Sequence, residues 1–235
     1  ETMGLKDFYT VKEKLGCGGF GSVFTGFRNS DSKPVAIKNI KKDEIDAWKT
    51  IKNITIPMEI YLLEKVRYIE GVVTLLDWYE ESDSFHIIME RLPSISLFDY
   101  QTEKRCFSEE ETRNFFNQIV RTLSKIHSVG VIHHDLTTEN ILIDTTNQKV
   151  NIIDFGLASL DNGEPIFEFM SGHWFTPPEF IINGCYNGHS ATVWCLGVML
   201  YDLLVGNMPF EFNEEICKGQ PEFPDGMSEG KFHSN

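Results

Sequence analysis

Two short polar stretches decide how this sequence is interpreted: Ile132-His133-His134-Asp135-Leu136-Thr137-Thr138-Glu139-Asn140 and, further on, Asp154-Phe155-Gly156. Asp135 could accept a proton from a substrate hydroxyl group. Asn140 and Asp154 carry hard oxygen atoms that suit Mg²⁺, an ion that takes few protein ligands and keeps the oxygens of bound phosphates. An isolated Asp-Phe-Gly is common by chance, so this interpretation depends on the motifs that precede it.

A glycine-rich stretch lies between two predicted strands and consists of Gly16-Cys17-Gly18-Gly19-Phe20-Gly21-Ser22-Val23. Glycines let backbone amides approach phosphate oxygens because no Cβ intervenes. By itself the stretch fits a plain glycine hairpin equally well. A dinucleotide-binding fold would need a helix directly after it, whereas the sequence here predicts a strand.

A lysine follows on a strand that is otherwise apolar, in Val35-Ala36-Ile37-Lys38. An edge lysine that points to water is one interpretation. The other is a cation for the α- and β-phosphates of a nucleotide, held by the carboxylate of Glu59 on the next predicted helix. The glycine stretch, the lysine and the three oxygen-bearing residues occur in one order with compatible gaps, and this combination favours the phosphate-binding interpretation.

The composition is that of a folded domain. The 235 residues are 41% hydrophobic and 24% charged, which excludes a disordered, collagen-like or coiled-coil chain. Five scattered cysteines without a Cys-x-x-Cys pair predict neither a disulfide framework nor a structural zinc site, and they favour the cytoplasm or the nucleus. We find no signal peptide and no apolar run of about 20 residues, so we expect no membrane association.

The formal net charge of −14 also bears on partners. Such a field disfavours binding to nucleic acid and would steer a cationic partner toward the chain. Ordinary solubility accounts for the same charge, so the sign alone identifies no partner.

The chain divides into a strand-rich first part and a helix-rich second part. Strands are predicted where β-branched and aromatic residues gather between turn residues, at Phe8–Leu15, Ser22–Arg28, Pro34–Ile40, Val72–Tyr79 and Ser84–Glu90. One helix begins near Pro57. In the second part, a capping box at Ser108–Glu111 opens a helix that ends near Gly130, two short strands follow at Ile141–Asp144 and Lys149–Ile153, and a further helix covers Ala191–Val205. The tail after about residue 216 lacks apolar periodicity, and we expect it to be frayed.

Taken together, these motifs resemble those of eukaryotic protein kinases, and most of all those of the Pim group of serine/threonine kinases. The similarity runs from about Tyr9 to Gln220 and also includes Pro57-Met58-Glu59, Leu75-Leu76-Asp77-Trp78, Glu139–Asp144, Pro177-Pro178-Glu179 and Val193–Phe210. It implies an α+β, bilobal protein-kinase fold. Residues 1–91 would form an antiparallel β-sheet lobe with one helix, and residues 92–235 a mainly helical lobe that is truncated, because a complete kinase continues for several helices after Phe210.

The resemblance also implies a function and a site. The chain would transfer the γ-phosphoryl group of ATP to Ser or Thr of protein substrates. ATP would bind between the lobes at Leu15, Gly16, Gly18, Gly19, Phe20, Gly21, Val23, Ala36, Lys38, Glu59, Met89, Glu90, Leu142 and Ile153. Asn140 and Asp154 would bind Mg²⁺, and Asp135 would be the catalytic residue. Asp99 and Glu139 match positions that meet arginines upstream of the target residue in basic substrates.

Three positions depart from the family pattern. Thr137 replaces a lysine that neutralises the γ-phosphate, and His134 replaces an arginine that grips a phosphorylated activation segment, the segment from Asp154 to Glu179. Gly172 replaces a threonine that bonds both that lysine and the catalytic aspartate. Two interpretations therefore stay open, a working kinase with slowed transfer and a pseudokinase that serves as a nucleotide-binding or scaffold module.

Overall fold

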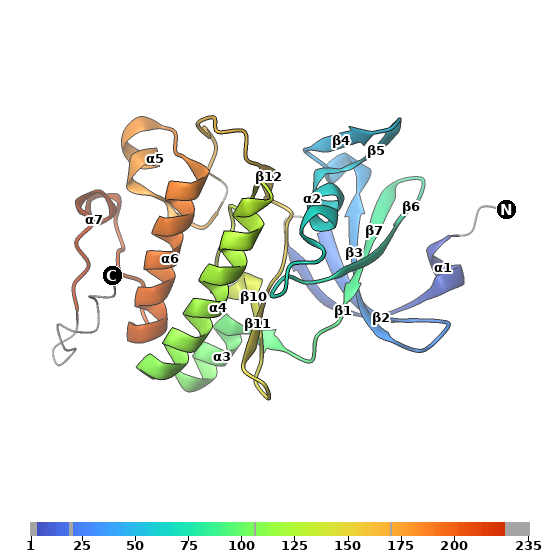
Figure 1. Cartoon of the computed structure of the whole chain (residues 1–235), viewed down its shortest axis with the longest axis horizontal. Coiled ribbons are helices and arrows are strands. Elements are labelled where there is room, and N and C mark those ends of the chain that lie inside the picture. The colour runs from blue at the N-terminus through green and yellow to red at the C-terminus, as the bar shows by residue number, and fades with distance from the viewer. Residues whose placement is uncertain (1–3, 19–20, 106, 170, 224–235) are drawn as a thin grey trace.

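The structure is a computed structural model of the chain, and it describes residues 4–18, 21–105, 107–169 and 171–223. Figure 1 shows two lobes side by side, with the strands up to β7 in one and most of the helices in the other. The predicted α+β architecture, with a sheet lobe followed by a helical lobe, is thereby confirmed.

The sheet lobe is built on five antiparallel strands in the order β1-β2-β3-β7-β6, preceded by the short helix α1 (Leu5–Phe8). The strands are β1 (Tyr9–Gly18), β2 (Gly21–Arg28), β3 (Pro34–Lys41), β6 (Leu75–Glu80) and β7 (Ser84–Glu90). Side chains alternate along the central strand β3. Val35 and Ile37 pack into a small outer cluster, while Ala36 and Lys38, paired with Met89 and Ile87, lie on the face toward the other lobe.

A hairpin that the sequence did not reveal precedes the helix of this lobe. After the 3₁₀ turn η1 (Lys42–Glu44), strand β4 (Trp48–Ile51) pairs with β5 (Ile54–Pro57). Lys52 and Asn53 connect them with φ of 46° and 70°, the conformation of a two-residue hairpin turn. Pro57 then begins α2 (Met58–Val66) as predicted, and this helix buries Glu59 beside the sheet.

The helical lobe is organised around two long helices. Helix α4 (Glu109–Ser128) begins at the predicted capping box, in which Ser108 Oγ accepts from the amide of Glu111. Its apolar stripe is buried against α6 (Gly188–Val205), which lies beside it in Figure 1. Among the described residues, α6 alone is long and apolar enough to cross a bilayer. One side of the helix, which includes Cys195, Met199 and Leu203, is buried in the core of the lobe.

Shorter elements complete this lobe. They are β8 (Ile95–Ser96), α3 (Leu97–Lys104), β9 (Val131–Ile132), η2 (Thr138–Asn140), β10 (Ile141–Asp144), β11 (Lys149–Ile152), β12 (Ser159–Leu160), η3 (His173–Phe175), α5 (Pro178–Asn183) and α7 (Asn213–Lys218). Residues 133–140 connect β9 to β10, and Asp154 follows β11, so both polar stretches lie at one end of these short strands.

Regular structure continues further toward the C-terminus than the sequence predicts. The sequence predicts fraying from about residue 216, whereas α7 runs to Lys218 and buries Ile216 completely. The carboxylate of Glu215 accepts hydrogen bonds from the amides of Glu211 and Phe212, and Gly219 ends the helix in the left-handed conformation. Local capping thus orders a segment that lacks apolar periodicity.

Candidate active site

A cavity of about 1030 Å³ lies between the two lobes. Ten of the predicted nucleotide-binding residues line it: Leu15, Gly16, Val23, Ala36, Lys38, Glu59, Met89, Glu90, Leu142 and Ile153. Asp154, Asp99 and Glu139 line it as well. Val23 and Ala36 come from the sheet lobe, and Leu142 and Ile153 from the helical lobe. An apolar slot of this kind suits a planar base.

The glycine stretch takes part unevenly. Gly16 lines the cavity and the described Gly21 does not, while the predicted contacts of Gly18, Gly19 and Phe20 lie outside what the structure describes. Gly21 has a structural reason to be glycine, because its φ is 119° and a Cβ would come within 2.3 Å of the carbonyl oxygen of Asn39. This glycine therefore permits the close pairing of β2 with β3.

The cavity also includes residues that the sequence analysis did not name. Leu63 lies one turn after Glu59 on the same face of α2, so helical spacing could have identified it. Val73 and the segment from Arg91 to Ser96 close the cavity on the side of the connection between the lobes. The segment follows Glu90 directly along the chain, whereas only the tertiary fold brings Val73 to the site.

Lys38 stands at the polar end of the cavity between two carboxylates. Its Nζ atom donates to Glu59 Oε1 at 2.7 Å and to Asp154 Oδ1 at 2.8 Å. The side chain of Lys38 is only 5% exposed and that of Glu59 only 7%, whereas that of Asp154 is 35% exposed. The predicted pairing of Lys38 with Glu59 is present, and it holds a cation where phosphates could reach it.

The charges of this group depend on one another. Burial by itself would lower the pKa of Lys38, but the Glu59 and Asp154 carboxylates outweigh it and raise that pKa. Burial raises the pKa of Glu59, and Lys38 opposes this. For Asp154, burial would raise the pKa, but Lys38 and the amide of Gly156 hold it below the ordinary value. Lys38 thus favours the charged form of Asp154 and offsets part of the effect of burial on Glu59.

Asp135, the predicted catalytic residue, is held on both of its carboxylate oxygens by residues of the chain. Asn140 Nδ2 donates to Asp135 Oδ2 at 2.7 Å and to the Asp135 carbonyl at 2.9 Å. Ser171 Oγ donates to Asp135 Oδ1 at 2.8 Å. A proton acceptor of fixed orientation therefore lies in the same loop as one of the two predicted Mg²⁺ ligands.

Comparison with known proteins agrees with this geometry. The sequence profile of the protein kinase domain matches residues 9–225 of the chain. The chain belongs to the protein kinase domain family.

Individual relatives refine this result. The kinase domain is 38% identical over 213 residues to the serine/threonine-protein kinase prk-2 of Caenorhabditis elegans, a match that covers 90% of this chain and 48% of that protein. It is 36% identical over 231 residues to the serine/threonine-protein kinase pim-2 of Danio rerio, covering 94% of this chain and 74% of that protein. Human NUAK family SNF1-like kinase 1 is 36% identical over 208 residues, covering 88% of this chain and 31% of that protein. The chain thus spans less than half of two of these relatives, and the resemblance to serine/threonine kinases of the Pim type is confirmed.

Ser171 is the site residue that the family pattern did not predict for this kinase domain. The position expected to bond the catalytic aspartate is Gly172, yet the hydroxyl that reaches Asp135 comes from the residue before it. Phe175 and Phe169 on either side are packed into the lobe, the latter against Phe180 and Tyr186. The only sequence signal for this contact was that Ser171 carries a hydroxyl next to the position of the missing threonine. The fold determines that this hydroxyl points toward Asp135.

We expect the Ser171→Ala variant to transfer phosphate about tenfold to a hundredfold more slowly, because one hydrogen bond to a charged group is lost. Ser171→Thr, which keeps the hydroxyl, is the matched control and should stay close to the unaltered protein. Initial rates on one peptide measure both. A faster Ser171→Ala variant would mean that the hydroxyl blocks Asp135 instead of orienting it.

The side chain of Thr137 carries no charge, and its hydroxyl forms no hydrogen bond to the described residues. Its Oγ1 atom is buried. The sequence has no lysine or arginine between Lys149 and Lys218, so the activation segment supplies neither of these cations. The missing charge at position 137 is therefore not replaced by a lysine or arginine from this segment.

The two histidines that precede Asp135 are structural and neutral. His133 Nε2 donates to the carbonyl of Ile153 at 2.9 Å and its Nδ1 accepts from the amide of Asp135, which links the catalytic loop to the strand before Asp154. Burial lowers the pKa of His134 to about 4, with help from its histidine neighbours. Its ring contacts Ser159 Oγ at 2.8 Å and the Tyr186 hydroxyl at 3.3 Å. An uncharged ring occupied in this way does not replace the phosphate-gripping arginine.

Metal binding depends on few protein groups. Within the described ranges, no group of three or more His, Cys, Asp or Glu side chains is placed to hold an ion. Asp154 is partly exposed at the cavity, and Asn140 is fixed beside Asp135. Two oxygen-bearing side chains, of which Asp154 lines the cavity, fit the chemistry of Mg²⁺, an ion that takes few protein ligands and keeps waters and phosphate oxygens as the others.

Proposed function

We propose that this kinase domain transfers the γ-phosphoryl group of ATP to Ser or Thr of protein substrates. The observation that carries the proposal is Lys38, held at 2.7 Å from Glu59 and 2.8 Å from Asp154 at the polar end of an apolar cavity. Burying such a cation costs stability, and its position suits the α- and β-phosphates of a nucleotide.

The residues of the chain have distinct roles in the proposed reaction. The apolar slot would hold the base, Lys38 would position the phosphates, and Asp135 would orient the acceptor hydroxyl and receive its proton. When bound at Asn140 and Asp154, Mg²⁺ would neutralise charge on the β- and γ-phosphates. Because His134 is neutral, we expect this activity not to depend on phosphorylation of the activation segment.

Thr137 favours a second candidate function. Without a cation at this position, the kinase domain could bind nucleotide and act as a scaffold without useful catalysis. Transfer of radiolabelled phosphate from Mg-ATP to an arginine-rich serine peptide separates the two functions, with Asp135→Asn as the control. Transfer that Asp135→Asn abolishes supports the enzyme, whereas equal background in both folded proteins supports the scaffold.

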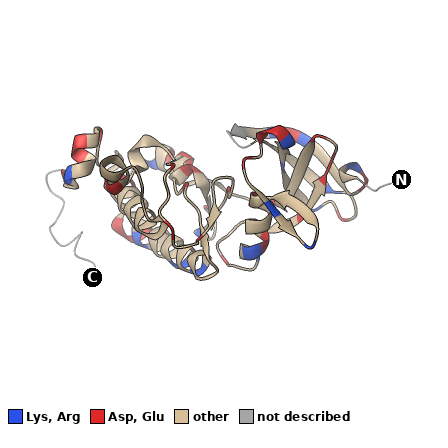
Figure 2. Cartoon of the chain, turned by 90° about the horizontal axis from the view of Figure 1, so that it is seen from above, with Lys and Arg blue, Asp and Glu red and all other residues tan. Residues whose placement is uncertain are grey.

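We also propose that the substrates are basic. Asp99 lies in the first turn of α3, where its backbone amide donates a hydrogen bond to Ser96 Oγ. It lines the cavity together with the exposed Glu139. Figure 2 shows acidic and basic residues scattered over both lobes, and the whole chain carries a net charge of −14. Cationic residues of a substrate would be attracted to this side of the cavity.

The expected effect on substrates is specific. The Asp99→Asn/Glu139→Gln variant should raise the KM for an arginine-rich peptide by up to about tenfold, because two partly solvated ion pairs are lost. The KM for the same peptide with alanines in place of the arginines should not change. Glu103→Gln/Glu110→Gln, which removes two exposed acids of α3 and α4 outside the cavity, is the control for net charge. Equal effects on both peptides would contradict the basic-substrate proposal.

A further inference from the structure

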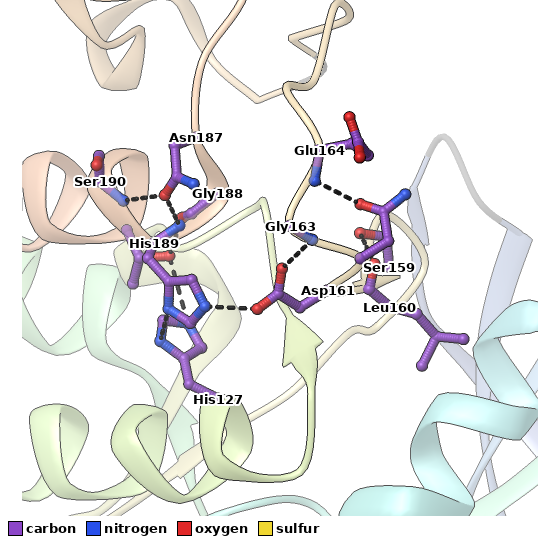
Figure 3. A network of polar contacts seen from close by, with 12 residues as sticks. His127, Ser159, Leu160, Asp161, Gly163, Glu164, Asn187, Gly188, His189 and Ser190 are labelled. Carbon is purple, nitrogen blue, oxygen red and sulfur yellow. Dashed lines mark hydrogen bonds and ion pairs between the residues drawn. The ribbon is translucent and has the colours of Figure 1, made fainter.

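Two histidines and an aspartate form a compact group away from the cavity, which we name the histidine cluster: His127, His189 and Asp161 (Figure 3). His189 Nε2 donates to Asp161 Oδ2 at 2.7 Å, and the Nδ1 atoms of the two histidines lie 3.0 Å apart. The rings meet edge to face with centroids 4.4 Å apart. The remaining carboxylate oxygen of Asp161 accepts from the amide of Gly163.

The cluster joins three elements that are distant in sequence. His127 lies in the last turn of α4, and His189 lies in the first turn of α6 beside the cap residue Asn187. Asp161 follows β12 directly, and its amide donates to the carbonyl of Gly130. The contact therefore fixes the early part of the activation segment to both long helices of the helical lobe.

The distances determine where the protons lie when both histidines are neutral. His189 carries its proton on Nε2, where Asp161 accepts it, so its Nδ1 is an acceptor. His127 must then carry its proton on Nδ1 and donate it to His189. The Nε2 atom of His127 is left as an acceptor, 3.5 Å from Thr192 Oγ1.

We propose that the histidine cluster is a proton-sensitive contact that holds the activation segment against α4 and α6 and opens when both of its rings become charged. One added proton is tolerated, because it can occupy His127 Nε2 while the hydrogen bond between the rings persists. A second added proton places hydrogens on both Nδ1 atoms, which face each other at 3.0 Å. The hydrogen bond is then lost and two positive charges oppose each other.

Charged and titratable groups from the neighbouring elements determine the pH range in which the histidine cluster opens. His127 of α4 faces His189 of α6, Asp161 of the activation segment and, from the catalytic loop, His134. Burial and then the charge of His189 lower the pKa of His127, which Asp161 only partly offsets. The hydrogen bond from His189 holds the pKa of Asp161 below its ordinary value. A depressed histidine pKa means that the closed contact is stable at neutral pH and is lost as the pH falls below about 6.5.

Amide hydrogen exchange in the full chain, read by mass spectrometry over residues 157–163, tests the proposal without any need for catalysis. After correction for intrinsic exchange, we expect protection of this segment to fall about tenfold between pH about 7.5 and about 5.5. In His189→Gln the fall in protection should disappear. The side-chain amide of the glutamine can still donate to Asp161 and accept from His127, but it does not take up a proton. His86→Gln, in the sheet lobe, should keep the fall.

Nitrogen NMR of the unaltered protein gives a second measurement that requires no variant. It should show His127 protonated on Nδ1 and His189 protonated on Nε2 at neutral pH. The proposal is overturned if the protons lie instead on Nε2 of His127 and Nδ1 of His189. It is also overturned if protection over residues 157–163 falls as much in His189→Gln as in the unaltered protein. Because neither measurement uses nucleotide, the failure of the proposed kinase activity would leave both results unaffected.

Discussion

The Lys38→Met variant should lose about 3–5 kcal/mol of unfolding free energy and all detectable phosphotransfer. Lys38 and Glu59 are only 4% and 7% exposed, so removing the cation leaves an uncompensated carboxylate in the interior. Breaking a buried ion pair by removing one partner typically costs this amount. Glu59 can reduce the cost by taking up a proton, because burial already raises its pKa.

A double variant separates stability from chemistry. In Lys38→Met/Glu59→Gln the buried negative charge is gone, and urea denaturation should show that much of the lost stability returns. Phosphotransfer should remain absent, because no cation meets the phosphates. If the single variant lost less than about 1 kcal/mol, or if Glu59→Gln restored nothing, the account of the Lys38 group would be wrong.

The Thr137→Lys variant should transfer phosphate about a hundredfold to a thousandfold faster than the unaltered protein. A charge that acts on the transferring group in a dry site contributes on the scale of ~2.7–4 kcal/mol. Thr137→Met has a long side chain without the charge and is the matched control. Single-turnover rates measure the effect, and equal rates for the lysine and methionine variants would show that charge at this position is not limiting.

Gly172 allows a further step in the same series. A Cβ added at this residue would meet no atom within 4 Å, so there is room for the first atom of the side chain in Gly172→Thr. A threonine here would supply the family hydroxyl beside a new lysine at position 137. We expect the double variant to exceed Thr137→Lys only if Ser171, which already contacts Asp135, leaves part of that role unfilled.

Local chemistry explains what could be predicted from the sequence. Lys38, Glu59, Asp135 and Asp154 were predicted as site residues because each has a side chain suited to phosphate chemistry and they occur in the order of the family motifs, and the structure brings the first two and Asp154 into contact. The capping box at Ser108 placed the start of α4 correctly because the signal lies within a single turn.

Features without a recognisable sequence signal could not be predicted. The β4–β5 hairpin depends on two residues with positive φ that are neither glycine nor an Asn-Gly pair. Helix α7 depends on capping by Glu215 and on the burial of a single isoleucine. Ser171 and the histidine cluster each join segments that are far apart in the sequence, and no spacing rule connects them.

The central claim is that Asp135 and Lys38 form a working transfer site in spite of Thr137. The most direct test is single-turnover transfer of radiolabelled γ-phosphate with the kinase domain in excess over Mg-ATP and a saturating serine peptide, because a trace contaminant cannot then account for the product. The account predicts slow but complete transfer to the peptide, lost in Asp135→Asn. ATP that stays bound and intact in the unaltered protein would contradict it and identify a nucleotide-binding scaffold.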